Sequence, residues 1–199
     1  MPANFLSLPR ELRDKIYELC LLPEEPNNPW DNDSNGSDDS DEGDLSLGLL
    51  GANKAINCEA RLILYKNRFD FSLASPEDLS SFLEKIGRKN ADCIRYIYVE
   101  FPVLHNLELG NVTIDADHTR ALDSIQGYCT SLKTLTTSRR STSAMELELD
   151  CLDNPKIVAE ALTLVNNRFR AISSLKDIIV ELNEYNLEDD MREQFENQG

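Results

Sequence analysis

Apolar residues near the N-terminus recur at the spacing of one helix face. The intervals between them are 3, 4, 4 and 3 residues, which predicts an amphipathic helix over residues 5–19. Pro9 fits the first turn of this helix, where its missing N–H costs nothing, and Glu11 lies near the positive end of the helix dipole. The residues that form the apolar face are Phe5, Leu8, Leu12, Ile16 and Leu19.

A second run with the same period follows an acidic stretch. It predicts one helix over residues 46–66, with a single apolar face. Each of the two helices needs a partner for its apolar stripe, so we expect them to lie close together in the fold. The face of the second helix consists of Leu49, Ala52, Ile56, Ala60 and Ile63.

The rest of the chain alternates between strand and helix patterns. Ser75, Pro76 and Asp78 form a helix start, with Ser75 as the N-cap, and Gly87 ends that helix. Residues 93–99 are β-branched or aromatic on both faces, which is typical of a strand covered on both sides. The other predicted elements are strands at 68–72, 132–137 and 175–182, an exposed edge strand at 145–149, and helices at 117–130 and from Asn154 onward.

Three segments share one plan, in which a helix ends in a short polar turn and an apolar–basic–x–apolar sequence opens a strand. They are residues 91–99, 129–135 and 172–180, and their equivalent positions Ile94, Leu132 and Leu175 are 38 and 43 residues apart. That distance is the length of one strand-plus-helix unit. Repeated units of this kind predict an α/β fold with a small, mostly parallel sheet that resembles a leucine-rich repeat, although an α+β fold stays open.

The charge of the chain is concentrated in two segments. The 199 residues include 20 Lys and Arg against 36 Asp and Glu, a net charge of −16, and residues 24–44 contribute nine acidic side chains with no basic one. We expect this insert to be a disordered spacer, in which Ser37 and Ser40 are phosphorylation candidates because acidic residues flank them. Such an acidic surface argues against nucleic acid or anionic membrane as a partner.

These patterns predict one folded unit with two acidic segments. The predicted parts are helices at 1–23 and 45–66, the acidic insert at 24–44, a βα-repeat body at 67–184 and an acidic tail at 185–199. In the tail, Leu187, Met191 and Phe195 recur at helical spacing.

No motif points to catalysis, a cofactor or a metal. The five cysteines form no Cys-x-x-Cys pair, which favours buried free thiols in a reducing compartment. Cys129 near Ser131 suggests a nucleophile, and His118 near Asp115 and Asp117 suggests an acid–base group, but a buried thiol and a helix cap explain them better. With no signal peptide or membrane-length apolar run, we expect a non-enzymatic intracellular protein, cytoplasmic or nuclear.

The opening sequence FLSLPRELRDKIYEL resembles the first helix of an F-box, whose signature is Leu-Pro-x-Glu-Leu followed by spaced Ile and Leu. The likeness to the F-box-like proteins of ascomycete fungi is closer still. It continues through residues 49–65, the short aromatic strand at 67–71, and the segments at 82–87 and 94–97. It covers about residues 4–101 well and the later βα units loosely.

This resemblance implies an adaptor. In F-box proteins the first helices bind the small adaptor subunit of a cullin–RING ubiquitin ligase, and the C-terminal part holds the substrate. The matching positions are Leu8, Pro9, Leu12 and Ile16. The alternative is a stand-alone interaction domain in which the same residues pack as core against the helix at 46–66. The resemblance names neither the client nor the biological process.

Overall fold

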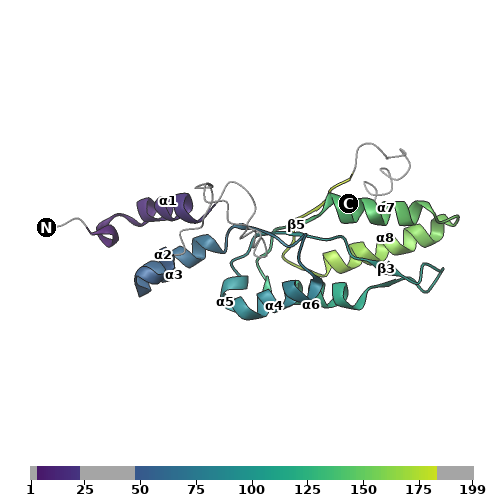
Figure 1. Cartoon of the computed structure of the whole chain (residues 1–199), viewed down its shortest axis with the longest axis horizontal. Coiled ribbons are helices and arrows are strands. Elements are labelled where there is room, and N and C mark those ends of the chain that lie inside the picture. The colour runs from purple at the N-terminus through teal and green to yellow at the C-terminus, as the bar shows by residue number, and fades with distance from the viewer. Residues whose placement is uncertain (1–3, 23–47, 183–199) are drawn as a thin grey trace, which may run out of the picture.

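The computed structural model describes residues 4–22 and 48–182. The N-terminal helices form one end of an elongated molecule, and the sheet with its helices forms the rest (Figure 1). Ser37 and Ser40, the acidic insert and the acidic tail lie outside the described residues, so those predictions stay predictions.

The helical end consists of a 3₁₀ turn and three helices. A polar break divides the region predicted as one helix at 46–66, because the side chain of Asn53 accepts the N–H of Ile56 and starts a new helix there. Pro9 is the residue before the first helix rather than part of its first turn. The elements are η1 (Phe5–Ser7), α1 (Arg10–Leu21), α2 (Gly48–Ala52) and α3 (Lys54–Leu64).

A four-stranded parallel sheet with the order β1-β2-β5-β6 forms the centre of the body, which confirms the α/β prediction. An antiparallel pair, β3 with β4, lies in the connection from β2 to β5. The strands are β1 (Arg68–Asp70), β2 (Tyr96–Val99), β3 (Leu104–His105), β4 (Thr113–Ile114), β5 (Thr134–Thr137) and β6 (Asp177–Val180). The helices of the body are α4 (Pro76–Ile86), α5 (Arg88–Ala91), α6 (Ala116–Tyr128), α7 (Arg139–Asp150) and α8 (Pro155–Arg170).

The three segments that share a sequence plan also share their turn geometry. In each, the N–H of the residue that opens the strand segment donates to the carbonyl three positions earlier, at 3.1 Å for Ile94, 3.1 Å for Leu132 and 3.0 Å for Leu175. The turns also bond to one another, because the N–H of Lys133 donates to Arg95 and that of Lys176 donates to Lys133. The repeated plan is therefore a repeated structure.

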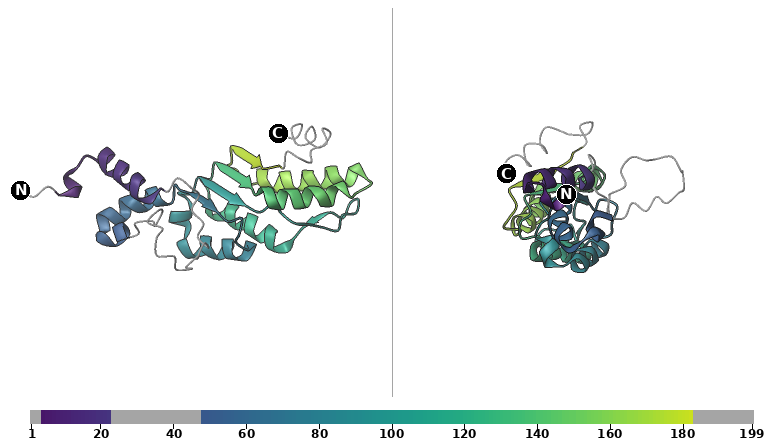
Figure 2. Two further views of the ribbon diagram at one scale, coloured as in Figure 1. Left: turned by 45° about the horizontal axis from the view of Figure 1, so that its top comes forward. Right: turned by 90° about the vertical axis from the view of Figure 1, so that its left-hand side faces the viewer.

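The described helices cover only one face of the sheet. Consecutive parallel strands joined by right-handed crossovers place every connecting helix on the same face, and burial along β2 alternates accordingly, with Ile97 and Val99 buried and Tyr96 42 % exposed. Figure 2 shows the helices gathered along one side of the strands. The prediction that residues 93–99 are covered on both sides is wrong, because tyrosine side chains point to the uncovered face.

The predicted edge strand at 145–149 is wrong as well. These residues belong to α7, in which Thr142, Met145 and Leu149 are buried at helical spacing while Leu147 is 58 % exposed. Ser138 caps the helix by accepting the N–H of Ser141. The alternation of apolar residues with Glu therefore does not reflect the two faces of a strand. It arises because Met145 and Leu149 lie on the buried face of a helix while Leu147 lies on its exposed face.

The helix starts predicted from capping residues are confirmed. Ser75 accepts the N–H of Asp78 and the Asp78 carboxylate accepts the N–H of Ser75, which is a complete capping box. Asn154 caps α8, whose next residue is Pro155. Gly87 ends α4 with φ at 73°, a conformation that favours glycine.

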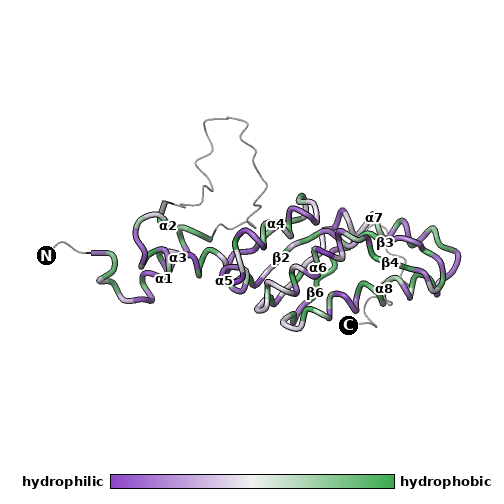
Figure 3. Tube along the Cα trace, turned by 90° about the horizontal axis from the view of Figure 1, so that it is seen from below, coloured by the Kyte–Doolittle hydropathy of each residue, from purple (hydrophilic) through white to green (hydrophobic). Residues whose placement is uncertain are grey.

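The described residues have two hydrophobic cores. The larger lies between the sheet and helices α4 to α8, and the smaller between α1 and α3. Tyr65 packs against both cores and stacks on Phe69, with ring centroids 6.2 Å apart. Hydrophobic segments accordingly occur in both the helical end and the body (Figure 3). Among the described helices none is long and apolar enough to cross a membrane.

One buried carboxylate of the body has an oxygen atom with no hydrogen-bond partner among the described residues. The side chain of Glu146 in α7 is 3 % exposed, and its Oε1 atom has no hydrogen-bond partner among the described residues. Burial raises the pKa of Glu146 above its ordinary value of 4.5, and the nearby charge of Asp150 adds to that effect. The folded state therefore holds the proton of this carboxyl group more tightly than the unfolded state does.

Replacing this carboxylate by its amide is expected to stabilise the protein. Because the folded state holds the proton to higher pH than the unfolded state does, the stability of the wild type declines as pH rises above about 4.5. Glu146→Gln removes the ionisable group, so we expect its unfolding free energy at pH 8 to exceed that of the wild type by about 1 kcal/mol. Urea titrations at pH 5 and pH 8 measure this difference, which should shrink at pH 5. An equal difference at both pH values would contradict the prediction.

Candidate protein-interaction surfaces

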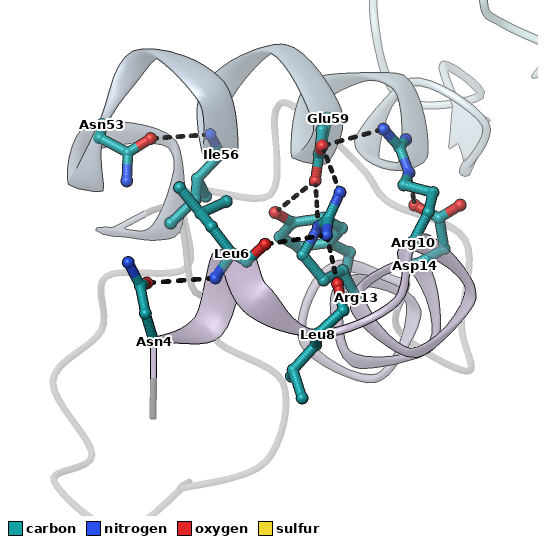
Figure 4. Close-up of polar contacts among 10 residues, drawn as sticks. Asn4, Leu6, Leu8, Arg10, Arg13, Asp14, Asn53, Ile56 and Glu59 are labelled. Atoms are coloured by element: carbon teal, nitrogen blue, oxygen red, sulfur yellow. Dashed lines mark hydrogen bonds and ion pairs between the residues drawn. The ribbon is translucent and has the colours of Figure 1, made fainter. Parts of the chain in front are cut away.

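An ion-pair cluster fixes α1 against α3. The guanidinium of Arg13 makes two hydrogen bonds with the carboxylate of Glu59, Nε to Oε2 and Nη2 to Oε1, each 2.8 Å long. Its third nitrogen donates to the carbonyls of Leu6 and Leu8, which precede the helix. Figure 4 shows Arg13 between these partners. One side chain therefore sets both the position of α1 and the path of the chain that leads into it.

Two further residues of α1 bind the same carboxylate. The hydroxyl of Tyr17 donates to Glu59 at 3.1 Å, and Arg10 lies 3.2 Å from it. Bonding to Arg13 holds the pKa of Glu59 at about 2, well below its ordinary value of 4.5. Burial raises the pKa of Tyr17. The Tyr17 ring itself is fully buried and meets Phe5 edge-on at 5.5 Å.

The ion-pair cluster turns Leu12 and Leu19 of the predicted apolar stripe away from the core, whereas Phe5 packs against it. The core positions of α1 are Tyr17 and Leu21, whereas Leu12 is 53 % and Leu19 is 77 % exposed. The expectation that the stripe packs on the next helix is therefore wrong for Leu12 and Leu19. Since residues 13, 17 and 21 lie on the α3 side, Leu12 and Leu19 lie on the opposite side of the helix, and Ile16 lies at its flank. Leu8 and Ile16 are partly exposed and Pro9 is exposed.

Of the four positions that the resemblance assigns to adaptor binding, Pro9 and Leu12 are exposed and Leu8 and Ile16 are partly exposed. We call Leu8, Pro9, Leu12, Ile16 and Leu19 the α1 stripe. Charged side chains border it, among them Lys15, which forms an ion pair with Glu18 at 3.1 Å. An apolar strip with a polar border is the usual form of a surface that binds another protein.

The uncovered face of the sheet is a second accessible surface, which the sequence reasoning missed. The strand register aligns Tyr96 with Thr134, and Tyr98 with Thr136, on this face. Tyrosine offers a large apolar ring with a polar tip, a combination that is common in protein interfaces. The two rows that cross the face are Arg68, Tyr96, Thr134 and Asp177, and then Asp70, Tyr98, Thr136 and Ile179.

Tyr98 is held in place on this face. Its hydroxyl donates to the Oε2 atom of Glu181 at 2.6 Å. Burial and this bond raise the pKa of Tyr98 to about 12. Tyr96, in contrast, has 42 % of its surface exposed, and Ile179 has 47 %. The face therefore combines one fixed ring with two accessible apolar side chains.

The first catalytic candidate, Cys129 with Ser131 as its neighbour, lies in a turn of the structure. Cys129 is fully buried and burial raises its pKa to about 12, so the reactive thiolate is not available near neutral pH. The hydroxyl of Ser131 bonds to Asp92 at 3.1 Å. The predicted nucleophile and its neighbour are thus parts of the turn that joins α6 to β5.

Asp115 is a helix cap, as predicted. Its Oδ1 atom accepts the N–H groups of Asp117 and His118 and bonds to the His118 ring at 3.1 Å. These bonds, with a contact from His105 at 3.3 Å, hold the pKa of Asp115 below its usual range. Asp117 instead forms an exposed ion pair with Arg120.

The expectation of buried thiols is met only by Cys129. Cys58 and Cys151 are exposed, and Cys20 and Cys93 are partly exposed. Within residues 4–22 and 48–182, no group of three His, Cys, Asp or Glu side chains has the arrangement to hold a metal ion.

Comparison with protein-family models, with curated proteins and with solved structures found no match to this chain. The F-box likeness therefore continues to depend on the residues quoted above.

The Arg13–Glu59 pair is the structural feature of this region that sequence reasoning missed most clearly. The two residues are 46 positions apart, on either side of the acidic insert. The sequence held one indication of a contact at Glu59. This residue directly precedes the core residue Ala60, so it lies at the margin of the apolar face of its helix. Periodicity alone does not say which partner such a margin residue meets.

Acid is expected to release α1 from α3. A carboxylate whose pKa is lowered by folding stabilises the folded state fully above about 4.5 and loses that contribution as pH falls towards 2. We therefore expect the NMR signals of the Tyr17 ring to shift towards their unfolded positions over this pH window. Glu59→Gln should show the shifted Tyr17 signals already at pH 7. Glu18→Gln, which alters an exposed pair of the same helix, should behave as the wild type does.

Proposed function

We propose that this protein is a non-enzymatic adaptor that uses the α1 stripe to bind the small adaptor subunit of a cullin–RING ubiquitin ligase. The observation that supports this function is the exposure of Leu12, with Leu8 and Ile16 partly exposed, at positions that match an F-box. They are available for docking without any opening of the helical end. The proposal includes an intracellular location, cytoplasmic or nuclear, where such ligases act.

An adaptor also needs a surface that binds its client, and the uncovered sheet face suits that role. The uncovered sheet face, with Tyr96, Thr134 and Ile179 accessible, is the proposed site for the protein client. It belongs to the body, whereas the α1 stripe belongs to the helical end, so the two partners contact different elements. Tyrosine-rich surfaces bind protein segments with little loss of side-chain entropy.

A binding measurement with the purified ligase adaptor subunit tests the proposal. Leu12→Asp places a charge in the middle of the α1 stripe, and we expect it to raise the Kd at least 30-fold, equivalent to about 2 kcal/mol. Because Leu12 is already 53 % exposed, the unfolding free energy should change by no more than about 0.5 kcal/mol. Isothermal titration calorimetry and urea unfolding of the same preparations measure both quantities.

The matched control is Leu147→Asp. It makes the same substitution at a comparably exposed leucine, in α7 of the body, and should leave both affinity and stability unchanged. If the wild type does not bind the subunit, the alternative of a stand-alone interaction domain replaces the adaptor. Loss of binding in Leu147→Asp as well would show that the charge acts non-specifically.

A further inference from the structure

The sheet ends in an apolar groove beside β6. Among the described strands, β6 is the last of the four and pairs only with β5. The groove has a volume of about 780 Å³ and lies between β6 and α8. Stacked βα units bury their apolar sides against the next unit, so the last unit needs a cover of its own.

The residues that line the groove indicate which kind of segment can occupy it. From α8 it includes Leu162, Val165 and Phe169, and from β6 it includes Ile178 and Val180. Ile178 and Val180 are only partly buried although they point to the helix-covered face. The groove therefore accepts apolar side chains.

The charges along the groove favour an acidic occupant. Arg170 and Lys176 contribute two positive charges to its lining, and Asp177 contributes one negative charge. An occupant with apolar residues on one side and acidic residues on the other therefore matches both the floor and the border of the groove.

The chain itself contains such a sequence immediately beyond the groove. Leu182 is part of the lining, and residues 183–199, outside the described part, follow it directly. This segment carries Leu187, Met191 and Phe195 at intervals of four, with six acidic residues and one basic residue, a net charge of −5. Because the two are covalently joined, the segment is present at the groove at high effective concentration.

A second copy of the chain fits the same site less well. If two β6 strands paired antiparallel so that Ile178 faced Val180 on the helix-covered side, Asp177 would face Glu181 on the other side. Like charges placed directly opposite each other destabilise a strand pair. The charge pattern of β6 thus disfavours edge-to-edge dimers.

We propose that residues 183–199 bind in the groove through Leu187, Met191 and Phe195 and so cover the end of the sheet. This inference is independent of the proposed adaptor function, because it concerns neither the α1 stripe nor the ligase. It assigns the acidic tail a structural partner within the same molecule.

Amide hydrogen exchange of the full chain tests this assignment. We expect Met191→Asp and Phe195→Asp each to accelerate exchange of the segment 175–182 at least tenfold, while segments in α4 and α6 keep their rates. Asn197→Asp, which adds the same charge two positions beyond Phe195, is the matched control and should leave the exchange rates unchanged. Unchanged exchange in the first two variants overturns the proposal.

A cross-linking experiment needs no destabilising variant. Photo-methionine at position 191 should cross-link within the same molecule to residues 162–169 or 178–182. Cross-links confined to other elements overturn the proposal. So does cross-linking between molecules whose yield falls on dilution, because it shows that a second copy covers the groove.

Discussion

The bidentate bond between Arg13 and Glu59 determines what the helical end presents to its surroundings. It joins α1 to α3 across 46 residues of sequence and leaves Tyr17 and Leu21 as the only fully buried side chains of α1. A guanidinium fork fixes orientation as well as distance, which a lysine at the same place does not do. The rotation of α1 about its own axis, and with it the accessibility of Leu12, follows from this one pair.

Local signals in the sequence predicted the elements well but not which faces they bury. The capping box at Ser75, the Asn154–Pro155 start and the repeated turns were readable because they depend on neighbours within a few residues. The orientation of α1 was not, because the helix carries two faces that accept burial, and a contact with Glu59 decides between them. Residues 145–149 were misread for a related reason, since Leu147 is apolar but exposed on a helix whose buried positions include Thr142.

The uncovered sheet face was missed because tyrosine obscures the inside–outside pattern. Tyr96 and Tyr98 alternate with Ile97 and Val99, so the strand reads as apolar on both faces. A tyrosine can remain accessible at little cost in free energy because its hydroxyl bonds to polar groups or water. The bond from Tyr98 to Glu181 is an example. The order of the strands, which follows their order in the sequence, is the stronger guide, because it places all crossovers on one side.

That sequential order also bears on how such a chain can change in length. Each βα unit bonds mainly to the units before and after it, as the chain of bonds from Arg95 to Lys133 to Lys176 shows. A whole unit gained or lost at the β6 end would lengthen or shorten the sheet by one strand and leave the remaining turns as they are. The helical end, joined to the body at Tyr65 and Phe69, lies at the opposite end of that array. Growth of the array would therefore enlarge the tyrosine-bearing face while α1 kept its orientation.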